Sequence, residues 1–400
     1  MSDVQVASSM TSTLLADPSK LHAWPCSAAS YSVLRPLGQG AFSRVFLARR
    51  TSAFEASQLV ALKVTPRYAD PIKTPSRELE VMLLLRDSPH VCHLLEYFFL
   101  VGEKASHSVL VLEAFTCNLR SIVMEPPVLV SRLRQARAVG QQLSRALSHM
   151  HGLGVIHRDI KTDNVLIQSD EDAAGPAVTE RPQCVLADFG AAKLLKPGEH
   201  SSPFAFARHY RAPELCLGSP TYTTAPDVWA LGCILGEVLL GGVSLLAPPS
   251  EQSEQASPVA APPLRDVEVR DIELGMNDSE RQLLTLFDHL GTPSWSELVS
   301  MNPTNLSDDT QRCAQWMSIP PREPSLSWRE HLVSSLRSDV PKGRAAIEGA
   351  EAESLTFYAT ALLAAIFTWD PEARPSAQAL GEIAFQLYSV SEAKGLMIKH

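Results

Sequence analysis

Two polar motifs constrain this chain more than any other feature of its sequence. Residues 157–164 read His-Arg-Asp-Ile-Lys-Thr-Asp-Asn, and residues 188–190, which begin 24 positions after Asn164, read Asp-Phe-Gly. Phosphoryl transfer from a nucleoside triphosphate requires a carboxylate that receives or orients a hydroxyl proton, and oxygen ligands that hold Mg²⁺ against the phosphates. The chain must therefore fold so that two loops, each with a carboxylate, meet at one site.

The chemistry of these side chains suggests a role for each polar residue. Asp159 is the predicted catalytic base, because Lys161 and Asn164 follow it at short spacing. Lys161 can neutralise the phosphoryl group during transfer, an electrostatic role that is strong when the donor is preorganised. Asn164 and Asp188 carry the hard oxygen atoms that Mg²⁺ prefers, so we predict them as the metal ligands.

The composition is that of a soluble globular protein. With 400 residues, the chain exceeds one ordinary hydrophobic core, so we expect two lobes or domains. The net charge of −9 argues against binding to a phosphate backbone, and we therefore expect no nucleic acid partner. Seven scattered cysteines without a Cys-x-x-Cys pair are typical of reduced thiols in an intracellular protein.

The sequence also predicts where the protein resides. Residues 1–30 are rich in Ser and Ala and lack the basic and apolar regions of a secretory signal. The longest apolar stretch, residues 230–247, is interrupted by Glu237, so we expect no membrane span. We expect a cytoplasmic protein, with the nucleus as a second location.

The chain changes character near residue 113. Before it, the pattern is mostly that of strands, with one helix that opens at Ser76. The expected strands are Tyr31–Leu37, Val45–Ala48, Leu59–Val64, Tyr97–Leu100 and Val109–Leu112. This arrangement predicts a small five-stranded lobe with one helix, in which the helix buries Leu79, Met82, Leu83 and Leu85.

After residue 113 the periodicity is helical. One amphipathic helix carries Leu133, Ala136, Val139, Leu143, Leu147 and Met150 and ends at Gly152. Further helices are expected at 226–240, at 278–290, at 353–367 and at 376–387. Residues 169–183 and 247–264 interrupt this pattern as insertions, and the second is expected to be a disordered surface loop.

A glycine-rich turn and a lysine precede the two motifs. The turn joins the first two expected strands and consists of Gly38, Gln39, Gly40, Ala41, Phe42 and Ser43. Glycines allow the backbone to fold over phosphate oxygens and to present N–H donors to them. Lys63, in the third strand, would neutralise the phosphates while a helix carboxylate, Glu78 or Glu80, holds it.

Two further pairs are expected to be structural. Glu214, in the sequence Ala-Pro-Glu, needs a buried cationic partner, and Arg374 is the natural candidate. His157 is expected to pack against Phe189 rather than to bind a metal.

Taken together, these motifs resemble the eukaryotic protein kinase family, from about residue 31 to residue 387. The resemblance implies an α+β, bilobal fold with ATP and Mg²⁺ as cofactors between the lobes. The small β-rich lobe would span 31–113 and the larger helical lobe 114–387, flanked by a flexible extension at 1–30 and a tail at 388–400. Asp159-Ile160-Lys161 is similar to the serine/threonine form of the catalytic loop.

The same resemblance implies residues that contact the nucleotide. Leu112 falls at the gatekeeper position, and Glu113 and Phe115 fall in the hinge. Val45, Ala61 and Leu166 would sandwich adenine. The Arg-Glu-Leu match at 77–79 favours Glu78 over Glu80 as the partner of Lys63.

Within this family the chain resembles the CMGC group and, more closely, the glycogen synthase kinase-3 subfamily. The matching segments include 77–79, 208–214, 227–229 and 291–293. In that subfamily three basic side chains bind a phosphate already present on the substrate, and the matching residues here are Arg77, Arg158 and Lys193. Clustered cations repel one another unless an anion binds between them, so such a pocket requires a bound anion.

The anion that binds in this pocket has two possible sources. One is a primed phosphoprotein substrate, and the other is the chain's own phosphate on Ser201 or Ser202. The tyrosine of the subfamily's activation loop is replaced by Phe204, which excludes control by tyrosine phosphorylation there. We expect a serine/threonine kinase of primed substrates, with scaffold proteins on the large lobe as further partners. The alternatives are a proline-directed kinase without priming and a pseudokinase scaffold.

Overall fold

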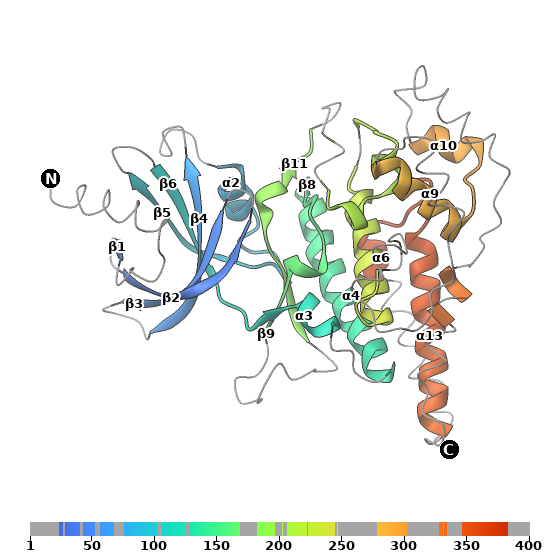
Figure 1. The fold of residues 1–400 in the computed structure, drawn as a ribbon, viewed down its shortest axis with the longest axis horizontal. Coiled ribbons are helices and arrows are strands. Elements are labelled where there is room, and N and C mark those ends of the chain that lie inside the picture. Colours follow the sequence, from blue (N-terminus) through green and yellow to red (C-terminus); the bar gives the residue numbers. More distant parts are fainter. Residues whose placement is uncertain are drawn as a thin grey trace. The chain divides into compact units, whose positions relative to one another are not determined.

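The computed structural model describes residues 24–26, 29–40, 43–52, 57–67, 76–101, 106–124, 129–168, 182–196, 202, 206–221, 223–244, 246, 278–301, 328–330, 332–333 and 346–382. The chain divides into two compact units, residues 1–115 and residues 116–400 (Figure 1). The first unit ends at Phe115, close to the expected end of the small lobe at residue 113.

The first unit is an antiparallel sheet with one helix. Its strands follow the order β1-β2-β3-β4-β6-β5. They are β1 (Trp24–Cys26), β2 (Ala29–Gln39), β3 (Arg44–Ser52), β4 (Gln58–Arg67), β5 (Leu94–Val101) and β6 (Ser106–Glu113). Strands β2 to β6 confirm the five expected strands. Strand β1, which pairs with β2, lies in the segment predicted as a flexible extension and was not expected from the sequence. The strand is three residues long and contains Pro25, so it gives no alternating pattern.

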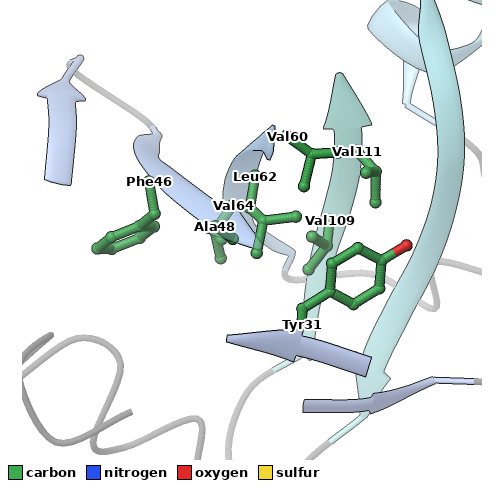
Figure 2. Packing of buried hydrophobic residues seen from close by; sticks show 8 residues of the cluster. All are labelled: Tyr31, Phe46, Ala48, Val60, Leu62, Val64, Val109 and Val111. Carbon is green, nitrogen blue, oxygen red and sulfur yellow. The ribbon is translucent and has the colours of Figure 1, made fainter. Parts of the chain in front are cut away.

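One face of this sheet carries the hydrophobic core of the first unit. Val60, Leu62 and Val64 alternate along β4 and point to the same side, each worth about 1.5–3 kcal/mol when buried. Ala61 and Lys63 therefore point to the opposite side of the strand. Figure 2 shows the cluster, which consists of Tyr31, Phe46, Ala48, Val60, Leu62, Val64, Val109 and Val111.

Helix α2 (Arg77–Leu84) begins where the sequence indicates. The Ser76 hydroxyl oxygen accepts a hydrogen bond of 3.3 Å from the Leu79 backbone N–H, which caps the helix. Of the expected apolar face, Leu79, Met82 and Leu85 are buried, but Leu83 is 46% exposed. The helix buries Val81 instead, because the buried arc runs through positions 81, 82, 85 and 79 and leaves position 83 outside it.

Helices dominate the second unit. Helices α4, α6 and α13 pack against one another (Figure 1). The described helices are α3 (Leu119–Val123), α4 (Leu129–Gly152), α5 (Pro213–Cys216), α6 (Ala225–Leu240), α9 (Asp278–Leu290), α10 (Trp295–Met301) and α13 (Ala346–Ile366). The expected apolar face of α4, from Leu133 to Met150, is buried, and the helix ends at Gly152 as predicted.

The helices predicted at 226–240 and 278–290 are confirmed as α6 and α9, whereas the last two helix predictions differ in their bounds. Helix α13 begins at Ala346, seven positions before the predicted start at 353. Its first turns are rich in Ala and Glu, which favour a helix, but they carry few large apolar side chains, so the apolar pattern did not reveal them. Residues 377–382 are helical, as part of the segment predicted at 376–387. The predicted insertion 247–264, and residues 169–181 of the other, lie outside the described residues.

Short strands and 3₁₀ turns position the two polar motifs. Strand β9 (Val165–Gln168) pairs with β10 (Gln183–Leu186), and Val165 lies opposite Leu186. The end of the first motif therefore lies beside the start of the second. The other short elements are β7 (Cys117–Asn118), β8 (Val155–Ile156), β11 (Lys193–Leu194), η2 (Thr162–Asn164), η3 (Phe189–Ala191) and η5 (Arg208–Tyr210). Within the described part of the chain, no helix is long and apolar enough to cross a bilayer.

Candidate active site

In the first unit, Lys63 and Glu78 form an ion pair. Strand β4 holds Lys63 and helix α2 holds Glu78, and the distance from Nζ to Oε1 is 2.5 Å. Both side chains are largely shielded from water, which strengthens their attraction. The pairing confirms Glu78 as the partner, whereas Glu80 is exposed. The role of this pair in orienting phosphates stays a prediction.

Several residues predicted to contact the nucleotide share one face of the sheet. Val45 of β3 lies opposite Lys63, and Ala61, two positions away on β4, lies opposite Leu112 of β6. Directly paired residues of an antiparallel sheet point to the same side, so these four side chains face away from the core cluster. The sheet register therefore gathers an aliphatic surface around the Lys63 ammonium group.

The described residues at the two ends of the glycine-rich turn are hydrogen-bonded to each other. Gly38 pairs with Val45, and the Gly40 N–H donates to the Ser43 carbonyl oxygen at 2.8 Å. Gln39 ends strand β2. Ala41 and Phe42 lie outside the described residues.

The predicted hinge begins at the end of β6. The Glu113 carboxylate accepts a hydrogen bond of 3.0 Å from the His93 backbone N–H, and Phe115 is half-buried. Leu166, in the second unit, is half-buried on β9 opposite Val185. These contacts place each residue in its own unit, and contact with adenine stays a prediction.

In the second unit, Asp159 is held by two side chains of its own loop. The Lys161 ammonium group donates to both carboxylate oxygens, at 3.0 and 2.8 Å. The Asn164 amide nitrogen donates to Oδ2 of Asp159 at 2.9 Å and to its carbonyl oxygen at 2.8 Å. The carboxylate is therefore fixed in orientation while it remains partly exposed to a substrate. These contacts bring the three predicted residues of this loop together, and their roles in transfer stay predictions.

His157 joins the two motifs through a single tautomer. Its Nδ1 accepts a hydrogen bond of 3.2 Å from the Asp159 N–H, so Nε2 is the nitrogen that donates to the Ala187 carbonyl oxygen at 3.1 Å. Burial lowers the pKa of His157, and the ring is therefore neutral. The ring packs edge-on against Phe189 at a centroid distance of 5.2 Å, as predicted.

Asn164 and Asp188 lie on neighbouring backbone segments. The Ala187 N–H donates to the Asn164 carbonyl oxygen at 2.9 Å. Asp188 adopts a left-handed backbone with φ of 64°, and its exposed carboxylate accepts from the Gly190 N–H at 3.3 Å. Because the Asn164 amide nitrogen is bonded to Asp159, its amide oxygen is the atom that can bind a cation. Asn164 and Asp188 therefore fit the predicted Mg²⁺ ligands in chemistry.

Asp227 anchors the backbone of the loop that carries Asp159, and the sequence did not indicate this contact. This fully buried residue of α6 accepts hydrogen bonds from the His157 N–H at 2.8 Å and from the Arg158 N–H at 3.0 Å. The His151 Nε2 lies 3.1 Å from its carboxylate. These bonds hold Arg158 at a φ of 69°, a strained conformation for a residue with a Cβ. The available signal was an aspartate in the first turn of a helix in which Glu237 is the only other charged residue.

The three residues of the predicted phosphate pocket fall in both units. Arg158 is buried and its Nε donates to the Ala191 carbonyl oxygen at 2.7 Å. Lys193, on β11, is half-buried and lies opposite Ile156 of β8. Arg77 belongs to the first unit and is exposed on α2. The structure therefore brings Arg158 and Lys193 into the same part of the second unit.

The segment before Ala-Pro-Glu is anchored to helix α9. Arg208 lies 3.3 Å from the Asp278 carboxylate, and the Arg211 guanidinium donates to the Ser279 hydroxyl at 3.1 Å. Ser202 is exposed, whereas Ser201 and Phe204 lie outside the described residues.

The predicted pair of Glu214 and Arg374 is confirmed. The guanidinium donates to both carboxylate oxygens, at 2.8 and 3.1 Å, and both residues are buried. This bidentate pair joins segments 160 positions apart in the sequence.

Comparison with known proteins adds an independent observation. A family model described as "Protein kinase domain" matches residues 31–385. The "Probable serine/threonine-protein kinase glkA" of Dictyostelium discoideum is 29% identical over 211 residues, which are 53% of this chain and 40% of that protein. The "Protein kinase MCK1" of Saccharomyces cerevisiae is 34% identical over 214 residues, which are 52% of this chain and 53% of that protein. The matched region thus covers about half of each of these curated relatives.

Proposed function

Because this chain belongs to the protein kinase domain family, we propose that it is a serine/threonine protein kinase that transfers the γ-phosphoryl group of ATP to protein substrates. The observation that carries the proposal is the Asp159 carboxylate, held by Lys161 and Asn164 beside the loop of Asp188. The names of both relatives, one a serine/threonine-protein kinase and one a protein kinase, support the same activity.

The residues of the second unit have complementary tasks in this reaction. The Asp159 carboxylate orients the acceptor hydroxyl and receives its proton, and Lys161 neutralises the transferring phosphoryl group. Neutral His157 keeps the loop of Asp159 in register with Ala187 and hence with Asp188. Mg²⁺, when bound with ATP, supplies charge neutralisation at the phosphates. The described residues contain no group of three or more His, Cys, Asp or Glu that could bind a metal by itself. This fits a cation that takes further ligands from the nucleotide and from water.

The substrate class in this proposal is a primed phosphoprotein. Supporting evidence comes from Arg158, whose backbone is locked by Asp227 and whose Nε is bonded to Ala191, so the terminal guanidinium nitrogens are preorganised for an anion. Lys193 lies on the neighbouring strand pair, and Arg77 is the third basic residue of the resemblance. The alternatives are a phosphate on the chain's own activation segment and a proline-directed kinase without priming.

A comparison of the parent chain with Asp159→Asn tests the activity. We expect phosphate transfer from ATP to a serine peptide to fall by about 10²–10⁴-fold, because the proton acceptor is lost. The melting temperature of both proteins, measured beside the kinetics, controls for folding. Equal transfer by both proteins would instead favour the pseudokinase scaffold.

Matched peptides test the substrate class. We expect a serine peptide with a phosphoserine a few residues downstream to be phosphorylated faster than its unphosphorylated twin. Lys193→Ala should lose more rate on the primed peptide than on the other, because an unprimed peptide brings no phosphate to that lysine. No preference between the peptides would discard priming and leave the proline-directed alternative.

A further inference from the structure

Glu237 is the residue that interrupts the apolar stretch at 230–247, and the active-site chemistry described above does not use it. Its side chain lies on α6 and is buried. The Thr162 hydroxyl donates to Oε2 of Glu237 at 3.0 Å, and the Tyr210 hydroxyl lies 3.1 Å from the Thr162 hydroxyl. One buried network therefore joins the catalytic loop, the segment before Ala-Pro-Glu, and α6.

Thr162 occupies a particular place within the catalytic loop. It directly follows Lys161 and precedes Asn164 by two positions, and both of these residues hold the Asp159 carboxylate. The Thr162 side chain is fully buried, and its backbone N–H also points to the Tyr210 hydroxyl at 3.5 Å. The loop thus presents Lys161 and Asn164 to the reacting group while Thr162 fixes it to the protein interior.

The donors and acceptors of this network match. Burial raises the pKa of Glu237 to about 7, while the hydrogen bonds from Tyr210 and Thr162 favour its charged form. A buried carboxylate needs such donors, and removal of one leaves an unsatisfied acceptor inside the protein. The Glu237 carboxylate therefore needs the Thr162 hydroxyl as a donor, and a methyl group at that position would leave the carboxylate oxygen unsatisfied.

We propose that Thr162 is a positioning residue of the transfer reaction, whose hydroxyl holds the catalytic loop on Glu237 and Tyr210 so that Lys161 and Asn164 orient the Asp159 carboxylate. This role rests on the proposed kinase function. Because the Thr162 side chain points into the interior, it does not bind substrate. Its loss should therefore slow transfer without weakening the binding of ATP or peptide.

Thr162→Val and Thr162→Ser in the full chain test this role. Valine keeps the shape and removes the hydroxyl, so we expect kcat to fall by about ten-fold or more while the KM for ATP changes by less than about two-fold. Serine restores the hydroxyl and should recover kcat to within about three-fold of the parent. Thr285→Val is the matched control, because that buried hydroxyl donates to the Arg281 carbonyl oxygen of its own helix, and its kcat should stay near that of the parent.

The outcomes separate this role from the kinase function itself. A Thr162→Val kcat within two-fold of the parent, or a serine variant that fails to recover, overturns the positioning role and leaves the kinase function intact. If the parent transfers no phosphate, the kinase function fails, and backbone amide exchange decides the network alone. Thr162→Val should then speed exchange in both 161–164 and 208–213 relative to Thr285→Val, and unchanged exchange in either segment overturns the network.

Discussion

The first unit holds Lys63 through another side chain, whereas the second unit holds the loop of Asp159 through a network that includes backbone groups. Lys63 on β4 pairs with the Glu78 carboxylate on α2. Asp159, in contrast, belongs to a loop whose own backbone N–H groups donate to the buried Asp227 and to His157. A pair of side chains can be replaced together, but the needs of backbone donors cannot be removed by substitution. The two units should therefore respond differently to the loss of one charged residue.

The largest effect on stability is expected at Asp227. Asp227→Ala leaves the His157 and Arg158 N–H groups and the His151 ring without an acceptor, and each buried unsatisfied group costs about 1–3 kcal/mol. We therefore expect the free energy of unfolding of the second unit to fall by about 5 kcal/mol, as measured by urea denaturation. Asp163→Ala, an exposed position in the same loop, is the control and should change it by less than about 0.5 kcal/mol. Similar losses from both variants would contradict the anchoring role of Asp227.

A smaller and reversible effect is expected at Lys63. Lys63→Met leaves the shielded Glu78 carboxylate without its cation, which should cost about 3 kcal/mol of stability in the first unit. Because the other partner is a side chain, Lys63→Met with Glu78→Leu should recover most of that loss. Denaturant unfolding of both single variants and the double variant completes a mutant cycle. A double variant as unstable as Lys63→Met would show that the two units do not differ in this way.

The same distinction explains which parts of the site the sequence could predict. The convergence of Asp159, Lys161 and Asn164 follows from residues close together in the chain, so their spacing was sufficient. Glu214 and Arg374 are far apart, but a buried carboxylate in an apolar setting requires a cation, and the segment 369–375 around Arg374 offered the candidate. The bonds of Asp227 to residues about 70 positions away depend on where α6 packs, and no local pattern encodes that.

The fold predictions failed where the pattern of apolar residues is weak. Five strands of the first unit carry runs of apolar residues and were predicted, while β1 has only three residues and a proline. Leu83 was assigned to the wrong face because the window of α2 is only eight residues long, too short to define its buried arc. The contacts of Thr162 with Glu237 and with Tyr210 were also missed, because a glutamate in a mostly apolar helix indicates a partner without identifying it.

Each unit contains a buried histidine that should make its stability depend on pH. Burial lowers the pKa of His107 in the first unit and of His157 in the second, so each is neutral when folded and binds its proton more readily when unfolded. Stability should therefore fall as the pH drops below about 6.5, by up to about 1.4 kcal/mol per pH unit for each histidine. Among the residues that the structure describes, neither ring nitrogen of His107 has a hydrogen-bond partner. His107→Leu should thus reduce this acid sensitivity without loss of stability at pH 8.

His157→Leu provides the contrast. It removes the bonds to the Asp159 N–H and the Ala187 carbonyl oxygen, so we expect it to destabilise the second unit at pH 8 as well as at pH 5. Thermal melting of both variants and the parent from pH 5 to pH 8 gives the comparison. If His107→Leu were as unstable as His157→Leu at pH 8, the His107 ring would make a stabilising hydrogen bond, and the expected difference between the two histidines would be wrong.

The smallest effect is expected at Asp278, where the second unit itself uses exposed side chains. The Arg281 hydrogen bond and the nearby Arg208 lower the pKa of Asp278, so the contacts persist at neutral pH and are lost in acid. The Asp278 side chain is 60% exposed, and exposed pairs contribute about 0–1 kcal/mol. We therefore expect Asp278→Asn to change the melting temperature slightly in low salt and not at all in 1 M salt, where charges are screened. A large effect that survives high salt would show that the anchoring of Arg208 to α9 resembles the buried network around Asp227 more than an exposed ion pair.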